Sequence, residues 1–256
     1  MFALVYALPV KVALVGASGF IGSKILTEAV ARGHAVTAIC RHPENVTKHE
    51  LVRAVAADVN DTATLVQEFQ GQDAIVHSYT SPPDPMARAF VGAALAEGGN
   101  VMAKILSYVP VDPAAHDASV KSRTDQQVAA TKSIIAAAKQ AGVKRILAVG
   151  GAGSLLIDGV RAMDRPDFPK AFEGGAVSTA VIKDVLKHEP DIEWTVLCPS
   201  KMIAAGERTG KFRVGGDDLL VAADGSSRIS LEDFAMAMID ELEQPRHTGH
   251  RFTVGY

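Results

Sequence analysis

The chain has 256 residues, of which 48% are hydrophobic and 21% are charged, and it carries a formal net charge of −3 at pH 7. This composition is typical of a globular protein that is large enough for one domain with a two-sided core. Basic and acidic residues are interspersed, which argues against a nucleic-acid or membrane surface, so we expect a small molecule as the partner.

The first ten residues, MFALVYALPV, are apolar but contain neither a basic segment nor a small-residue cleavage site. They therefore predict neither a secretory signal nor a membrane anchor. Cys40 and Cys198 lie within apolar runs, where a buried, reduced thiol is more common than a reactive one. These features together predict a cytoplasmic protein.

Short β-branched runs alternate with helical segments along the chain. The expected strands cover residues 11–15, 35–40, 74–79, 145–150 and 194–200, and the expected helices cover residues 20–32, 61–69, 122–141 and 176–188. This alternation predicts an α/β fold of βαβ units around a parallel sheet that is buried on both faces. We expect a single domain over residues 1–256, with an insertion or lid at about 80–119 that contains a helix near 86–97. Residues 206–220 predict a hairpin around Gly215 and Gly216.

The stretch GASGFIG joins the first expected strand to the first expected helix. Gly16 is expected to turn the chain, Gly19 to let backbone approach a phosphate, and Gly22 to let the helix pack against the sheet. The free N–H groups at the start of the helix would then face a pyrophosphate. In this context we expect dinucleotide binding rather than only a tight turn. The expected binding residues of the loop are Gly16, Ser18, Gly19, Phe20, Ile21 and Gly22.

The second expected strand is followed by Arg41 and His42, not by the acidic residue that holds the ribose 2′-OH in NAD sites. A guanidinium suits a 2′-phosphate, so we expect NADP(H), with NAD(H) as the alternative cofactor. The alternative role of Arg41 is that of an exposed loop cation. In the stretch AADVND, at the end of a further expected strand between residues 40 and 61, Asp58 is expected to accept from the adenine amino group and Val59 to flank the ring. Asp58 or Asn60 also fits as a cap for the next helix.

Several further stretches share a family pattern with the glycine loop: RHPENV, ADVND, AGVKRILAVGGAGSL, WTVLCPS, GERTGKFRVG and ISLEDFAMAMIDELEQPRHTGHRFTVGY. With them, the chain resembles the atypical short-chain dehydrogenase/reductase group of NAD(P)H-binding proteins. That group includes NADH-flavin reductases and NAD-dependent epimerase/dehydratases and is related to the NmrA-like regulators. The resemblance implies a Rossmann-type doubly wound parallel sheet with helices on both faces, a small C-terminal region at about 200–256 that closes the substrate cleft, and a homodimer. It also implies that the nicotinamide half of the site is lined by Ser78, Tyr79, Gly150, Gly151, Pro199 and Ser200.

The proton donor of the wider superfamily is missing from this sequence. Tyrosine-dependent members use a Tyr-x-x-x-Lys pair, in which the lysine lowers the pKa of the phenol. This chain has tyrosines only at positions 6, 79, 108 and 256, and none is followed by a lysine four residues later. The remaining catalytic candidates lie at or just beyond the carboxyl ends of the expected strands: Tyr79, Ser154 and His77. His77 lies inside an apolar strand run, which favours a hydrogen-bonded core histidine over a catalytic one, whereas Ser154 fits equally the cap of a turn.

We therefore expect an NAD(P)H-dependent oxidoreductase that transfers a hydride to a small planar acceptor, such as a flavin, a quinone or a related carbonyl. This transfer requires little of the protein beyond orienting two rings. The alternative is a non-catalytic NADP(H)-binding redox sensor of the NmrA-like kind. The sequence contains no metal-ligand spacing of His, Cys and carboxylate residues and no Gly-x-Ser-x-Gly elbow, so it predicts neither a metal site nor a hydrolase.

Overall fold

A central eight-stranded sheet organises the computed structural model, which describes residues 8–82 and 112–256. From one edge to the other, its strands are β10 (Arg213–Gly215), β12 (His250–Gly255), β8 (Glu193–Cys198), β5 (Arg145–Val149), β4 (Ala74–His77), β1 (Lys11–Val15), β2 (Ala35–Cys40) and β3 (Val52–Ala56). Neighbouring strands are parallel, except that β10 runs antiparallel to β12. The direction of winding reverses between β1 and β4, as in Rossmann folds, which confirms the predicted doubly wound sheet.

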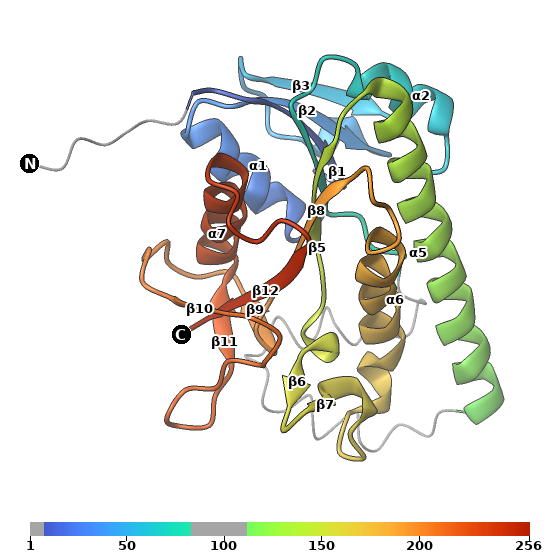
Figure 1. The fold of residues 1–256 in the computed structure, drawn as a ribbon, viewed down its shortest axis with the longest axis vertical. Helices are drawn as coiled ribbons and strands as arrows, with labels where there is room; N and C mark the ends of the chain where they lie inside the picture. The colour runs from blue at the N-terminus through green and yellow to red at the C-terminus, as the bar shows by residue number, and fades with distance from the viewer. Residues whose placement is uncertain (1–7, 83–111) are drawn as a thin grey trace, which may run out of the picture.

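Helices cover both faces of this sheet (Figure 1). One face carries α1 (Gly22–Ala31) and α7 (Leu231–Glu243), and the other carries α2 (Thr62–Phe69), α5 (Pro113–Ala141) and α6 (Lys170–Leu186). Alternate residues of β1 serve the two layers: Leu14 packs on the α1 and α7 side, and Val15 packs on the α2, α5 and α6 side. The period of two in a strand thus explains why the strand sequences read as continuous apolar runs.

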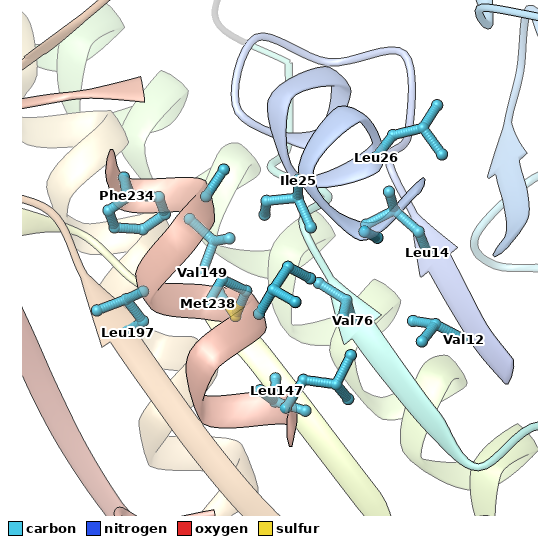
Figure 2. Close-up of a cluster of buried hydrophobic side chains, with 14 of the residues drawn as sticks. Val12, Leu14, Ile25, Leu26, Val76, Leu147, Val149, Leu197, Phe234 and Met238 are labelled. Carbon is cyan, nitrogen blue, oxygen red and sulfur yellow. The ribbon is translucent and has the colours of Figure 1, made fainter. Parts of the chain in front are cut away.

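The core between the sheet and the helices α1 and α7 is shown in Figure 2. Ile25 of α1 and Phe234 and Met238 of α7 face Val76 and Val149 of the central strands in this view. Phe234 is completely buried. Burial of one such side chain contributes about 1.5–3 kcal/mol to the stability of the fold. This layer fixes α1, and with it the glycine loop, against the carboxyl ends of the strands.

Side-chain caps explain where several helices begin. Asp61 accepts a hydrogen bond from Thr64 N (3.1 Å) at the start of α2, and Ser230 accepts from Asp233 N (3.0 Å) at the start of α7. Each cap satisfies a backbone donor that the helix leaves unpaired. The cap of α2 is therefore Asp61 and neither Asp58 nor Asn60, which corrects that alternative.

Several expected boundaries differ from the structure. Helix α5 begins at Pro113 instead of residue 122, so it takes in the end of the expected 80–119 insertion. The rest of that insertion, with the helix expected near 86–97, lies almost entirely outside the described residues. Helix α6 spans Lys170–Leu186, six residues earlier at its start than expected. Short 3₁₀ helices are η1 (Pro43–Asn45), η2 (Ala152–Ser154) and η3 (Ala162–Asp164), and short paired strands are β6 (Leu156–Ile157), β7 (Val160–Arg161), β9 (Met202–Ala204) and β11 (Arg228–Ser230).

The hairpin expected around Gly215 is wrong. Strand β10 pairs with β12, through Val214 opposite Val254, and not with the residues that follow it. The next residues turn instead to Leu156, whose N–H donates to Asp217 O (2.9 Å) and whose carbonyl accepts from Leu219 N (2.9 Å). Residues 213–215 thus pair with β12, which is distant in the sequence, and not with the residues across a local turn.

The C-terminal region, residues 200–256, contributes β12 and α7 to the main layers of the fold. Its role in closing a substrate cleft stays a prediction. Within residues 8–82 and 112–256, none of the helices combines the length and the apolar character needed to cross a bilayer.

Candidate functional site

A cavity of about 370 Å³ opens where the carboxyl ends of β1, β2, β3 and β4 meet. This is the point at which the strand order reverses, where ligands of doubly wound sheets bind. Its volume lies in the usual range for small-molecule sites. The residues that line it are Val15, Gly16, Ser18, Gly19, Ile39, Cys40, Arg41, His42, Ala57, Asp58, Val59, Asn60, Ser78, Tyr79, Thr80, Pro82 and Gln126.

The glycine loop forms one wall of this cavity because its backbone approaches its neighbours closely. Gly16 has a φ of +89°, and a Cβ added there would lie 2.7 Å from Ser78 O. A Cβ added at Gly22 would lie 2.1 Å from Gly16 O. Only glycine fits either position. The third glycine thus allows the helix to approach its own loop, whereas we had expected it to approach the sheet.

The start of α1 lies next to the cavity. Among the residues that the structure describes, no side chain caps this helix. Gly19 lines the cavity, and its carbonyl accepts from Ser23 N (2.9 Å), which closes the loop onto the helix. An uncapped helix start favours an anion, so the geometry suits a pyrophosphate. Phe20 and Ile21 do not line the cavity: Phe20 is exposed and Ile21 packs against the core.

Arg41 and His42 lie at the end of β2 on the rim of the cavity. Both are exposed, and His42 Nδ1 lies 3.1 Å from Glu44 Oε1. Among the residues that the structure describes, no carboxylate forms an ion pair with Arg41. Its guanidinium is thus available to an anion that enters the cavity.

Asp58 and Tyr79 line the cavity together with Arg41. Asp58 Oδ1 accepts from Asn60 N (2.8 Å), which fixes the turn after β3. Burial raises the pKa of the Tyr79 phenol, while Arg41 acts to lower it and Asp58 to raise it. The phenol is therefore within electrostatic reach of the two groups expected to hold the adenosine part of a dinucleotide. The catalytic role of Tyr79 stays a prediction.

The other two catalytic candidates are buried and do not line the cavity. His77 is completely buried, its Nε2 lies 3.2 Å from Thr131 Oγ1, and desolvation lowers its pKa to about 4. Thr131 Oγ1 donates to Gln127 O (2.8 Å), so it must accept from His77 Nε2. Ser154 donates to Gly151 O (2.9 Å) within η2. Their contacts are those of a core histidine and a turn cap.

Of the six residues expected around the nicotinamide, Ser78 and Tyr79 line the cavity, and the other four are buried. A Cβ at Gly151 would lie 2.1 Å from Thr179 Oγ1, and one at Gly150 would lie 2.5 Å from Cys198 Sγ. Ser200 Oγ donates to Val254 O (2.9 Å), and Pro199 precedes it in the same buried segment. The cavity therefore gathers Gly16, Ser18 and Gly19 of the expected loop residues and the residues expected for adenosine, but neither Phe20, Ile21 and Gly22 nor these four.

Sequence reasoning did not single out several cavity residues. Ile39, Ala57 and Thr80 extend the stretches already chosen, so their places follow from the strand ends. Gln126 comes from α5, more than forty residues beyond β4 in the chain, and no local pattern predicts its position. The described residues contain no group of three or more His, Cys, Asp or Glu side chains placed to hold a metal ion.

The chain is similar to known proteins over nearly its whole length. A family model described as NAD(P)H-binding matches residues 16–245. A provisionally named epimerase from Bacteroides thetaiotaomicron is 35% identical, covers 97% of both chains and superposes with a TM-score of 0.76. A provisionally named exported protein from Burkholderia pseudomallei is 35% identical over 96% of this chain and 100% of its own, with a TM-score of 0.74. A provisionally named NADH-flavin reductase from Streptococcus pneumoniae is 27% identical over 96% and 99% of the two chains, with a TM-score of 0.67.

Proposed function

Because the chain belongs to the NAD(P)H-binding family, we propose that it is an NAD(P)H-dependent oxidoreductase of the atypical short-chain dehydrogenase/reductase type. The observation that carries the proposal is the cavity at the reversal of strand order, with the glycine loop on one wall and Arg41 on its rim. Similarity to the provisionally named NADH-flavin reductase supports the reaction class. The bound dinucleotide would supply the hydride, and the chain would bind and orient the two reactants.

We assign the cofactor as NADP(H) in preference to NAD(H), with Arg41 at the 2′-phosphate. Arg41 follows the strand whose tip reaches the adenosine ribose in this fold, and among the described residues no carboxylate forms an ion pair with its guanidinium. Tyr79 and Asp58 lie near enough to complete an adenosine-side pocket. The preference for NADP(H) thus rests on charge, since a guanidinium matches a phosphate better than a hydroxyl.

Replacing Arg41 by alanine is expected to weaken binding of NADP⁺ by about 1.5–3 kcal/mol, the cost of one charge-assisted contact. Binding of NAD⁺, which has no 2′-phosphate, should change little. Calorimetric titration of both cofactors measures the difference. Lys48→Ala, which removes an exposed cation of the same connecting segment outside the cavity, is the matched control. Equal losses for the two cofactors in Arg41→Ala would remove Arg41 from the 2′-phosphate pocket.

The proposed acceptor is small, planar and largely apolar. Three exposed apolar side chains lie towards the carboxyl edge of the sheet: Phe20 in the loop after β1, Phe172 in the first turn of α6, and Met202 just after β8. Ligands of this fold bind at that edge, so an apolar acceptor bound there would lie near these side chains. No Tyr-x-x-x-Lys pair is present to protonate an alkoxide. Flavins and quinones need least help of that kind.

The test follows NADPH absorbance with flavins, quinones and simple ketones at saturating cofactor. We expect flavins or quinones to oxidise NADPH faster than ketones do, because ring orientation provides most of the rate. If NADPH binds tightly and no acceptor reacts above background, the chain is better described as a redox sensor. The burial of His77 and Ser154 is the observation that keeps this second function in view.

Two further expectations stay predictions. The homodimer was inferred from the family resemblance alone. The cytoplasmic location is untested, and one protein that is 35% identical to this chain is provisionally named an exported protein. Size-exclusion chromatography with light scattering tests the first, and fractionation of the producing cell tests the second.

A further inference from the structure

Gln127 of α5 is a polar side chain at a completely buried position. Its neighbours on the same buried stripe are Ala130, Ile134 and Ala138, which pack into the core. Gln127 Oε1 accepts from Ser81 N (2.7 Å), and Nε2 donates to Tyr79 O (3.2 Å). One side chain thus makes two hydrogen bonds to the backbone that follows β4.

The backbone held in this way is a wall of the candidate dinucleotide cavity. Ser78, Tyr79, Thr80 and Pro82 all line the cavity. On its other side the same segment meets the glycine loop, since Ser78 O and Tyr79 N lie within 2.8 Å of the position of a Cβ at Gly16. The segment is therefore fixed between α5 and the glycine loop.

The anchor on α5 is itself buttressed from β4. Thr131, one turn after Gln127, donates to Gln127 O and lies 3.2 Å from His77 Nε2. All three side chains are fully buried. In such surroundings hydrogen bonds are strong, and an unpaired group is costly. The position of α5 along its own axis, relative to the end of β4, is thus fixed by polar contacts as well as by packing.

We propose that Gln127 is a positioning residue for the dinucleotide site, which it shapes by fixing residues 78–82 at the cavity wall. The proposal rests on the proposed function, because the site it positions is the NADP(H) site. Gln127 does not line the cavity, so it acts through the backbone of Tyr79 and Ser81. A residue needed only for stability would leave cofactor affinity unchanged once the protein is folded.

The test compares wild type with Gln127→Met, which keeps the length of the side chain and removes both hydrogen bonds. We expect faster amide hydrogen exchange over residues 78–82 and an NADPH dissociation constant raised about tenfold, a change equivalent to about 1.4 kcal/mol. Gln127→Glu, which keeps an acceptor for Ser81 N but loses the donor to Tyr79 O, should raise the dissociation constant less. Should the Met variant fail to fold, an unchanged dissociation constant in Gln127→Glu overturns the proposal.

Gln72→Met is the matched control. Gln72 Nε2 donates to Thr37 Oγ1 (3.1 Å) between α2 and the start of β4, at the edge of the sheet away from the cavity. We expect this variant to melt at a lower temperature and to bind NADPH as wild type does. If folded Gln127→Met shows the amide exchange rates and the NADPH dissociation constant of wild type, the proposed role of Gln127 is overturned, but the proposed function is not. Failure of wild type itself to bind NADPH would instead overturn the proposed function.

Discussion

Replacing Glu241 by alanine is expected to lower the free energy of unfolding by about 3–5 kcal/mol, because it leaves a buried guanidinium without its partner. Glu241 Oε1 accepts from Arg145 Nη2 (2.9 Å), and both side chains are at least nine-tenths buried. The same carboxylate accepts from His247 N (3.0 Å) and lies 2.8 Å from His247 Nδ1. Burial alone would raise the pKa of Glu241, but the hydrogen bonds from His247 and Arg246 lower it overall.

This loss should not affect the cofactor site. Arg145 begins β5, at the opposite edge of the sheet from the cavity, and Glu241 lies near the end of α7. Chemical denaturation gives the free energy of unfolding, and NADPH titration below the transition gives the affinity. Asp125→Ala, which breaks an exposed ion pair with Lys121, is the control and should change stability little. A Glu241→Ala protein as stable as wild type would show that the network contributes nothing.

The sequence allowed the layered architecture to be predicted because the signals for it are local. A β-branched run such as residues 11–15 reads as a buried strand, and GASGFIG needs only its flanking strand and helix to be recognised. Helix α7 and strand β12 were not set out as separate elements. Helix α7 nevertheless has a clear signature, since Ser230 caps it and Glu232 and Asp233 occupy its first turn.

Strand alternation also bears on the catalytic candidates. Val76 packs on the α1 and α7 side, so the next residue, His77, must face α5, where Thr131 meets it. That reasoning was available from the pattern and favours the core role of His77. The contributions of α5 were not available. Gln126 and Gln127 reach the cavity region only because a helix of 29 residues packs beside β4, and no short-range rule sets that register.

Replacing Gly19 by valine is expected to raise the NADPH dissociation constant about a hundredfold or more, equivalent to about 2.8 kcal/mol. Gly19 lines the cavity next to the uncapped start of α1, where the backbone must approach the pyrophosphate. It does not have a positive φ, and a Cβ there would lie 3.1 Å from Gly16 O, a close contact that a shift of a few tenths of an ångström would relieve. The fold should therefore accept the side chain while the ligand does not.

Gly216→Val provides the matched control for that loss. Gly216 also lacks a positive φ, and a Cβ added there meets no atom within 4 Å. Its position after β10 is remote from the cavity lining, so the same substitution should leave both the melting temperature and NADPH binding near their wild-type values. Calorimetric titration of NADPH into the two folded variants shows whether the loss of affinity comes from a valine at position 19 or from the introduction of a valine anywhere in the chain. If Gly19→Val keeps its circular dichroism and binds NADPH as tightly as wild type, the glycine loop does not hold the pyrophosphate, and the assignment of the cavity fails with it.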